Sequence, residues 1–276
     1  MHHAAYFYLE MHTHELTVPY TNKPRRIRVL LPKDYQKNEN KSYPVLYFHD
    51  GQNVFYSRES FSGHSWKIIP AIKKNPDIPQ MIVVGIDNDN ENRLNEYSPW
   101  PFTNTPIPEG MRLGGKGLNY ADFVMNVVKP FIDSHYRTKP DKRYTAMAGS
   151  SLGGNITQFM GLEYADQIGN LGVFSSASWL TVEAFNRYIS RQKLDPSQRI
   201  FIQVGTQEGD ETDRDLTHGN MKQIYINASL SYYQQLLAGG MPQDRLQLIV
   251  AADATHSEEA WATYLPDCLR FLSEEW

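Results

Sequence analysis

The sequence predicts an α/β fold with three layers, in which a mostly parallel central sheet lies between helices and begins with an antiparallel hairpin. Three observations predict it. Short apolar segments recur that suit strands buried on both faces of a parallel sheet, and helical periodicity fills the intervals between them. The 276 residues contain no repeat, low-complexity tract or linker that would divide them, so we expect a single domain over 1–276.

The expected elements follow the chain in order. Residues 5–20 and 26–31 alternate polar and apolar side chains and are expected to pair as the hairpin. The apolar segments are expected to form buried strands at 44–49, 81–86, 144–148, 171–174, 200–204 and 246–250. Apolar side chains at helical spacing predict helices at 120–136, 152–164, 220–238 and 258–272, the first of them kinked by Pro130. The irregular stretch 87–117 contains four prolines and is expected to be a lid-like insertion.

The composition excludes several classes of protein. Hydrophobic residues make up 41% of the chain and charged residues 21%, which is ordinary globular usage and excludes wholesale disorder. With a net charge of −4 and no block rich in Lys and Arg, we expect no nucleic-acid partner. No apolar run reaches about 18 residues, so we expect no membrane span. The single cysteine, Cys268, excludes an internal disulfide framework.

The N-terminal segment has neither a basic start nor an apolar core, so it does not resemble a signal peptide. A cytoplasmic protein is the simplest interpretation. A secreted protein whose leader has been removed is the alternative.

The strongest local motif is G-x-S-x-G at residues 149–153, which places Ser151 between a predicted strand and a predicted helix. This is the context of a nucleophile elbow, a tight turn that presents a serine hydroxyl at the edge of the sheet. The glycines flank the serine because a side chain there would collide with neighbouring backbone. The alternative is a glycine-rich turn with a helix-capping serine and no chemistry. The strand before the motif and the helix after it favour a catalytic Ser151.

A serine hydroxyl needs a base, and the base needs an acid that orients it. In this arrangement the acid and then the histidine follow the serine, each in a loop after a later strand. Of the nine histidines, His256 alone meets that order. Glu208 and Asp210 lie in the loop after the strand 200–204, and Asp253 also lies near His256 in sequence, so the acid stays open among these three.

An acyl-transfer site also needs hydrogen-bond donors for the oxyanion that develops during attack. One donor is expected to be the backbone N–H of Leu152, directly after the nucleophile. The other is expected from the loop after the strand 44–49, through the N–H of Gln52 or of Gly51.

Several segments resemble one known family. In chain order they are residues 31–35, 43–55, 84–87, Arg93 with 96–100, 130–133 with 136–138, 174–179 and 256–261. Together they resemble the putative-esterase family of α/β-hydrolases, which includes esterase D and the enterochelin, feruloyl and acetylxylan esterases.

The resemblance implies an α/β-hydrolase fold and a serine carboxylic-ester hydrolase that works through an acyl-enzyme on a small acyl, aryl or siderophore-type ester, with no metal or organic cofactor. It implies Ser151 as nucleophile, His256 as base and Glu208 as acid, because the acid of the family usually lies three residues after the glycine that ends the strand. Relatives often have Asp there, so Asp210 remains the alternative. Some siderophore esterases use only a Ser–His pair.

The residues that select the substrate are less well defined by the sequence. Trp100 and Trp179 fall in segments that the family places near the active-site edge, where they either stack on an aryl group or pack in the core. Arg93 either binds a carboxylate of the substrate or pairs with Glu96, and we expect the pair.

Three other functions stay open. The same acyl-enzyme can transfer its acyl group to an alcohol, which makes the protein an acyltransferase. A hydrolase fold can also serve as a non-catalytic binding module. His12 and His14 form an H-x-H pattern found in metal-dependent amidohydrolases, although a complete site needs further ligands. We expect a small-molecule ester as the partner, and a homo-oligomer is open.

Overall fold

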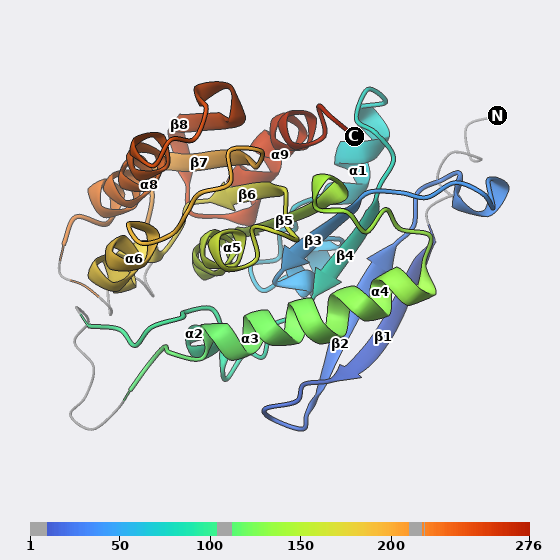
Figure 1. The fold of residues 1–276 in the computed structure, drawn as a ribbon, viewed down its shortest axis with the longest axis horizontal. Coiled ribbons are helices and arrows are strands. Elements are labelled where there is room, and N and C mark those ends of the chain that lie inside the picture. Colours follow the sequence, from blue (N-terminus) through green and yellow to red (C-terminus); the bar gives the residue numbers. More distant parts are fainter. Residues whose placement is uncertain (1–9, 104–111, 210–216, 218) are drawn as a thin grey trace.

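The computed structural model describes residues 10–103, 112–209, 217 and 219–276. In this part of the chain one sheet has the strand order β1-β2-β4-β3-β5-β6-β7-β8 (Figure 1). The strands are β1 (Met11–Thr17), β2 (Pro24–Leu30), β3 (Val45–His49), β4 (Ile82–Ile86), β5 (Thr145–Ser150), β6 (Asn170–Phe174), β7 (Arg199–Gln207) and β8 (Leu246–Thr255). β2 pairs antiparallel with both β1 and β4, and the strands β3 to β8 are parallel to one another. The predicted fold class is therefore confirmed.

Helices cover both faces of the sheet (Figure 1). α1 (Ile68–Lys74) and α9 (Glu258–Leu272) pack with each other on one face, where Trp66 and Trp261 stack inside a buried apolar cluster. The helices on the other face are α3 (Gly117–Phe123), α4 (Lys129–His135), α5 (Leu152–Glu163), α6 (Val182–Ile189) and α8 (Met221–Ala238). Each face thus buries its own core, as expected for a parallel sheet.

The helices differ in detail from the expectation. The helix predicted over 120–136 begins at Gly117 and widens to a π-helical turn over Val124–Val128 before α4. Pro130 in the first turn of α4 has no N–H to donate, and the wider turn lies where that hydrogen bond is lost. The short helices α1, α2 (Arg93–Glu96) and α6 were not predicted, because each has too few turns to show a clear periodicity.

The described part of the predicted insertion, residues 87–103 and 112–117, is anchored to the domain. It contains α2, whose Glu96 is fully buried, as is the following Tyr97. The side-chain amide of Asn155 on α5 donates to the Tyr97 carbonyl at 2.8 Å. This stretch therefore lies against α5, the helix that follows Ser151.

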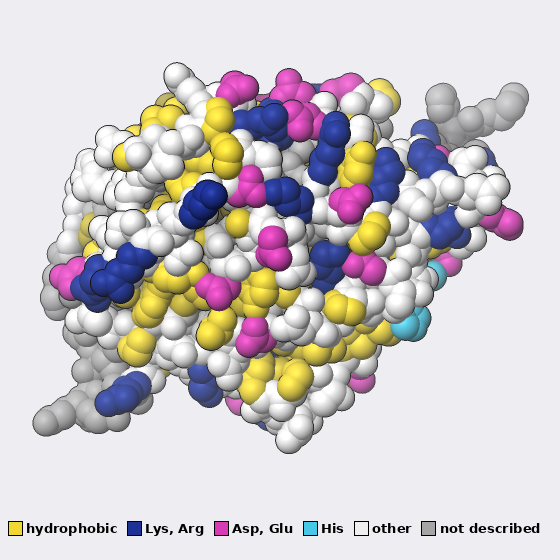
Figure 2. All heavy atoms as spheres, viewed as in Figure 1, with side chains coloured by type: hydrophobic (Ala, Val, Ile, Leu, Met, Phe, Trp, Pro, Cys, Tyr) yellow, Lys and Arg dark blue, Asp and Glu magenta, His cyan; other side chains and the backbone are white. Residues whose placement is uncertain are grey.

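Acidic and basic side chains are interspersed on the face shown in Figure 2. Among the helices that the structure describes, none combines the length and the apolar character needed to cross a bilayer.

Candidate active site

The elbow at Ser151 has the geometry that its glycines predict. Ser151 follows β5 directly and has φ 58° and ψ −123°, a conformation that costs free energy for a residue with a side chain. Its N–H donates to the Phe174 carbonyl at 2.9 Å, and its carbonyl accepts from the Ala177 N–H at 3.0 Å. A Cβ on Gly149 would lie 2.6 Å from the backbone of Gly153, so the turn closes only with glycine there. The surrounding backbone therefore holds the strained turn in place.

Glu208 and His256 meet at the same edge of the sheet. Glu208 follows β7 and His256 follows β8, and these strands are adjacent and parallel. His256 Nδ1 donates to Glu208 Oε2 at 2.6 Å, and both side chains are buried. Because a carboxylate only accepts, the proton lies on Nδ1, which leaves Nε2 as the basic nitrogen of the neutral ring. Of the three candidate acids, Glu208 is the one that the described structure joins to His256.

Glu208 is held by further donors. Its Oε1 accepts from the Gly205 N–H at 2.6 Å and from the Ser175 hydroxyl at 2.5 Å. Ser175 in turn accepts from the indole N–H of Trp261 at 2.8 Å. The rings of Trp261 and Tyr225 contact the imidazole of His256, with centroids 5.0 Å and 4.7 Å away. The acid and base thus have little freedom to reorient.

Ser175 is a member of this network that sequence reasoning did not find. It lies in a Phe-Ser-Ser segment directly after β6 and has φ 42°, so it occupies a tight turn at the same edge of the sheet. The position after a buried strand was its only signal, and many serines share it.

The turn after β3 lies against the first turn of α5. Asp50 has φ 54° and opens a short 3₁₀ turn over Gly51–Asn53. A Cβ on Gly51 would lie 2.6 Å from the Gly85 backbone, so only glycine fits. A Cβ on Gly153 would lie 3.2 Å from Asp50 Oδ2, which places the Asp50 carboxylate beside the start of the elbow helix. The expected oxyanion donors, on Leu152 and in this turn, therefore belong to two backbone segments in contact.

Arg93 binds Asp50, so the expected pair with Glu96 is wrong. Arg93 Nε and Nη2 donate to the two oxygens of Asp50, each at 2.7 Å. Glu96 instead accepts two hydrogen bonds at 3.0 Å from Arg25 and one at 2.7 Å from Tyr20. Helix spacing would allow an i, i+3 pair, but each side chain has a bidentate partner outside α2, which is Asp50 for Arg93 and Arg25 of β2 for Glu96.

Comparison with known proteins assigns the family. A family model described as "Putative esterase" matches residues 19–272. The chain belongs to this putative-esterase family. A protein similar to this esterase is the "Uncharacterized protein YbbA" of Bacillus subtilis strain 168, with 26% identity over 248 residues, 90% of this chain and 92% of YbbA.

Solved structures resemble the esterase over most of its length. A ferulic acid esterase superposes with a TM-score of 0.71 at 20% identity, covering 98% of this chain and 100% of that chain. The enterobactin esterase FES of Shigella flexneri, solved in the presence of enterobactin, superposes with a TM-score of 0.71 at 16% identity, covering 96% of this chain and 59% of that chain. These likenesses show the α/β-hydrolase fold, and the family match identifies a carboxylesterase-type hydrolase.

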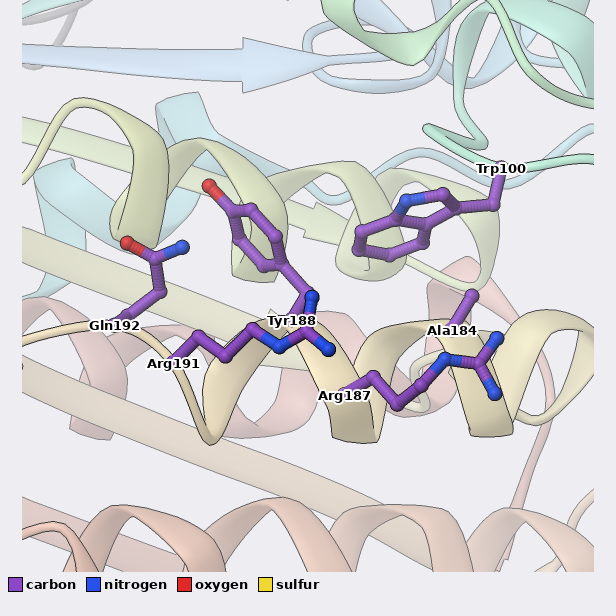
Figure 3. Close-up of a pocket in the computed structure, with 6 residues that line it drawn as sticks. All are labelled: Trp100, Ala184, Arg187, Tyr188, Arg191 and Gln192. Carbon is purple, nitrogen blue, oxygen red and sulfur yellow. The ribbon is translucent and has the colours of Figure 1, made fainter.

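The two tryptophans expected near the substrate lie in different surroundings. Trp179 of the esterase is buried, and its ring lies 5.8 Å from that of Tyr225, which contacts His256. Trp100 instead packs on Phe159 of α5 and Tyr188 of α6, at 5.7 Å and 5.3 Å. It lines a cavity of about 200 Å³ (Figure 3), together with Ala184, Arg187, Tyr188, Arg191 and Gln192.

The other candidates from the sequence are Asp210, Asp253, His12 and His14. Asp210 lies outside the described residues. Asp253 is exposed, and its N–H donates to the Thr206 hydroxyl at 2.8 Å. His12 and His14 both hydrogen bond to the Tyr136 hydroxyl, and within the described ranges no three His, Cys, Asp or Glu side chains gather as a metal site.

Proposed function

We propose that the protein is a serine esterase that cleaves its substrate through an acyl-enzyme, with Ser151 as nucleophile, His256 as base and Glu208 as acid. The observation that carries the proposal is the 2.6 Å bond between His256 and Glu208, which lies at the sheet edge where the elbow presents Ser151. The serine, the acid and the histidine follow one another along the chain, and each comes after a parallel strand of the sheet, as such a triad requires.

In the first step, the Ser151 hydroxyl attacks the ester carbonyl as His256 Nε2 accepts its proton. The Glu208 carboxylate stabilises the imidazolium that forms and keeps the ring in the correct tautomer. The tetrahedral intermediate then expels the alcohol, which takes the proton from His256, and the acyl group remains on Ser151. In the second step, water gives a proton to His256 and attacks the acyl-enzyme, and the acid is released as His256 returns the proton to the Ser151 oxygen.

The oxyanion of each tetrahedral intermediate needs preorganised donors. We propose the backbone N–H of Leu152 and that of Gln52, with Gly51 as the alternative to Gln52. Leu152 is the first residue of α5, so its N–H has no acceptor within the helix, and the positive end of the helix dipole adds to the stabilisation.

We propose that the substrate is a small ester with an acyl, aryl or siderophore-type acid. Support comes from the similar ferulic acid esterase and enterobactin esterase, whose names describe aryl or siderophore substrates. Trp179, which is 9% exposed, packs on the fully buried Tyr225, and Tyr225 contacts His256, so the exposed edge of Trp179 is the aromatic surface here that would suit an aryl acyl group. Trp100 and Arg93 contribute less directly, because Trp100 packs on α5 and α6 and Arg93 is bound to Asp50.

Hydrolysis of short-chain p-nitrophenyl esters tests the proposal. Ser151→Ala should lower kcat by at least about 10⁴-fold, because the nucleophile and its base act as one unit. Ser150→Ala is the matched control, since it removes the neighbouring hydroxyl of the same turn. A fluorophosphonate probe should label the wild type and not Ser151→Ala. Undiminished hydrolysis by a folded Ser151→Ala would falsify the assignment of the nucleophile.

A further inference from the structure

The turn after β3 carries a buried negative charge close to the place where the reaction develops one. Asp50 is 4% exposed, and its Oδ2 lies beside Gly153 in the first turn of α5. The charge of an unpaired carboxylate in such a position would oppose an oxyanion bound by the N–H groups of this turn and of Leu152. Electrostatic repulsion of this kind is strong where water is excluded.

Arg93 cancels that charge in a fixed geometry. Its guanidinium meets both oxygens of Asp50 at 2.7 Å, a bidentate contact that sets direction as well as distance. Burial alone would raise the pKa of the Asp50 carboxyl, but the charge and hydrogen bonds of Arg93, with a hydrogen bond from Asn88, hold that pKa below its ordinary value. The pair therefore stays ionised at neutral pH.

The other polar groups of the turn are also tied to the domain. The Asp50 N–H donates to the Tyr97 hydroxyl at 3.0 Å, and Gln52 Oε1 accepts from the Asn88 N–H at 3.1 Å. Asn53 Nδ2 donates to Glu258 at 2.9 Å, two residues after His256. One of these bonds uses the backbone of the turn and two use its side chains, so the turn is held on both sides of the N–H groups that we assign to the oxyanion.

We propose that Arg93 is a positioning residue of the esterase, which neutralises Asp50 and holds the oxyanion turn against the start of α5. The role differs from the binding of a substrate carboxylate, because the guanidinium is already engaged by Asp50. The proposal rests on the proposed function, since it assigns the turn to the oxyanion.

The experiment compares kcat and KM of Arg93→Met, Arg93→Lys and the double variant Asp50→Asn/Arg93→Met on a p-nitrophenyl ester. Arg93→Met should lower kcat about 100-fold, the scale of losing one oxyanion donor, and change KM by less than about threefold. The double variant should have a kcat at least about tenfold above that of Arg93→Met, because it removes the uncompensated charge. The kcat of Arg93→Lys should lie between those of the wild type and Arg93→Met, since lysine keeps the charge and loses the bidentate contact.

Arg25→Met is the control, because Arg25 makes a bidentate pair with Glu96, at the other end of α2, that is buried even more deeply than the Arg93–Asp50 pair. It should lower the melting temperature and leave kcat within about threefold. The proposal is overturned if Arg93→Met raises KM alone, if it lowers kcat no more than Arg25→Met does, or if the double variant recovers nothing. If Arg93→Met does not fold, Arg93→Lys decides, and a kcat equal to wild type overturns the proposal. Ser151→Ala, measured alongside, shows separately whether the proposed function fails.

Discussion

The two halves of the candidate site, which we name acid–base and oxyanion after their proposed roles, bind the buried carboxylates of Glu208 and Asp50 in opposite ways. Glu208, in the acid–base half, is bound by an imidazole, a hydroxyl and a backbone N–H, and its described partners include no Arg or Lys. Asp50, in the oxyanion half, is clamped by a guanidinium. A negative charge is useful beside a forming imidazolium and harmful beside a forming oxyanion. Under the proposed mechanism, the surroundings of each carboxylate match the sign of the charge that forms next to it.

Removing the charge of Glu208 should have the largest effect. Glu208→Gln keeps the shape of the side chain but loses the charge, so kcat for a p-nitrophenyl ester should fall about 10³–10⁴-fold. Circular dichroism should show an intact fold. A loss in kcat below about tenfold would show that Ser151 and His256 suffice as a pair. The charge of Glu208 would then not be needed for catalysis.

Distorting the oxyanion turn should have the next largest effect. Gly51→Ala places a methyl group where the Gly85 backbone lies 2.6 Å away, so the turn must shift. We expect kcat to fall about 100-fold, as when an oxyanion donor is misplaced. Gly63→Ala is the control, because Gly63 has φ +75° and no atom within 4 Å of the added methyl group. It should cost stability without changing kcat, and equal kcat values for both variants would contradict the assigned role of the turn.

Removing the Ser175 hydroxyl, in the acid–base half, should have a smaller effect than the changes at Glu208 and Gly51. Ser175→Ala deletes one donor to Glu208, so the free energy of unfolding should fall by about 1–3 kcal/mol and kcat by about tenfold. Ser175→Gly removes the same hydroxyl but accepts the positive φ of this position. Urea titration should find Ser175→Gly no less stable than Ser175→Ala, and any difference between them measures backbone strain.

Acid should destabilise the fold through His49 at pH values where Asp50 is still ionised, because the pKa of the Asp50 carboxyl lies below its ordinary value. Burial lowers the pKa of His49 from 6.5 to about 3, and its Nδ1 bonds the Tyr120 hydroxyl at 2.8 Å. The unfolded chain therefore binds a proton that the native state refuses, so stability is full above pH 6.5 and falls by about 1.4 kcal/mol per pH unit toward pH 3. His49→Gln should flatten this slope in urea titrations at several pH values. An unchanged slope would show that other groups cause the acid sensitivity.

A local sequence motif predicted the elbow, whereas the partners of other site residues depend on contacts between segments that are distant in sequence. Gly149 is required by a contact with Gly153, four residues later, so this part of the motif was visible in the sequence, whereas the nearest neighbours of Gly153 come from the distant turn after β3. The strand order of an α/β sheet likewise brought Glu208 and His256 to one edge, as expected. Arg93 was assigned to the wrong carboxylate because its true partner lies 43 residues earlier, and only the packing of α2 against the turn after β3 decides between them.

The sheet order also bears on how activity should return after unfolding. The candidate site needs the ends of β3, β5, β7 and β8, which come from all three thirds of the chain, whereas the β1–β2 hairpin forms from neighbouring residues. Contacts between distant segments form slowly, because the chain must first lose the entropy of the loops that join them. In a refolding time course, ester hydrolysis should therefore reappear after the helical signal, and it would report the moment at which the whole sheet has assembled.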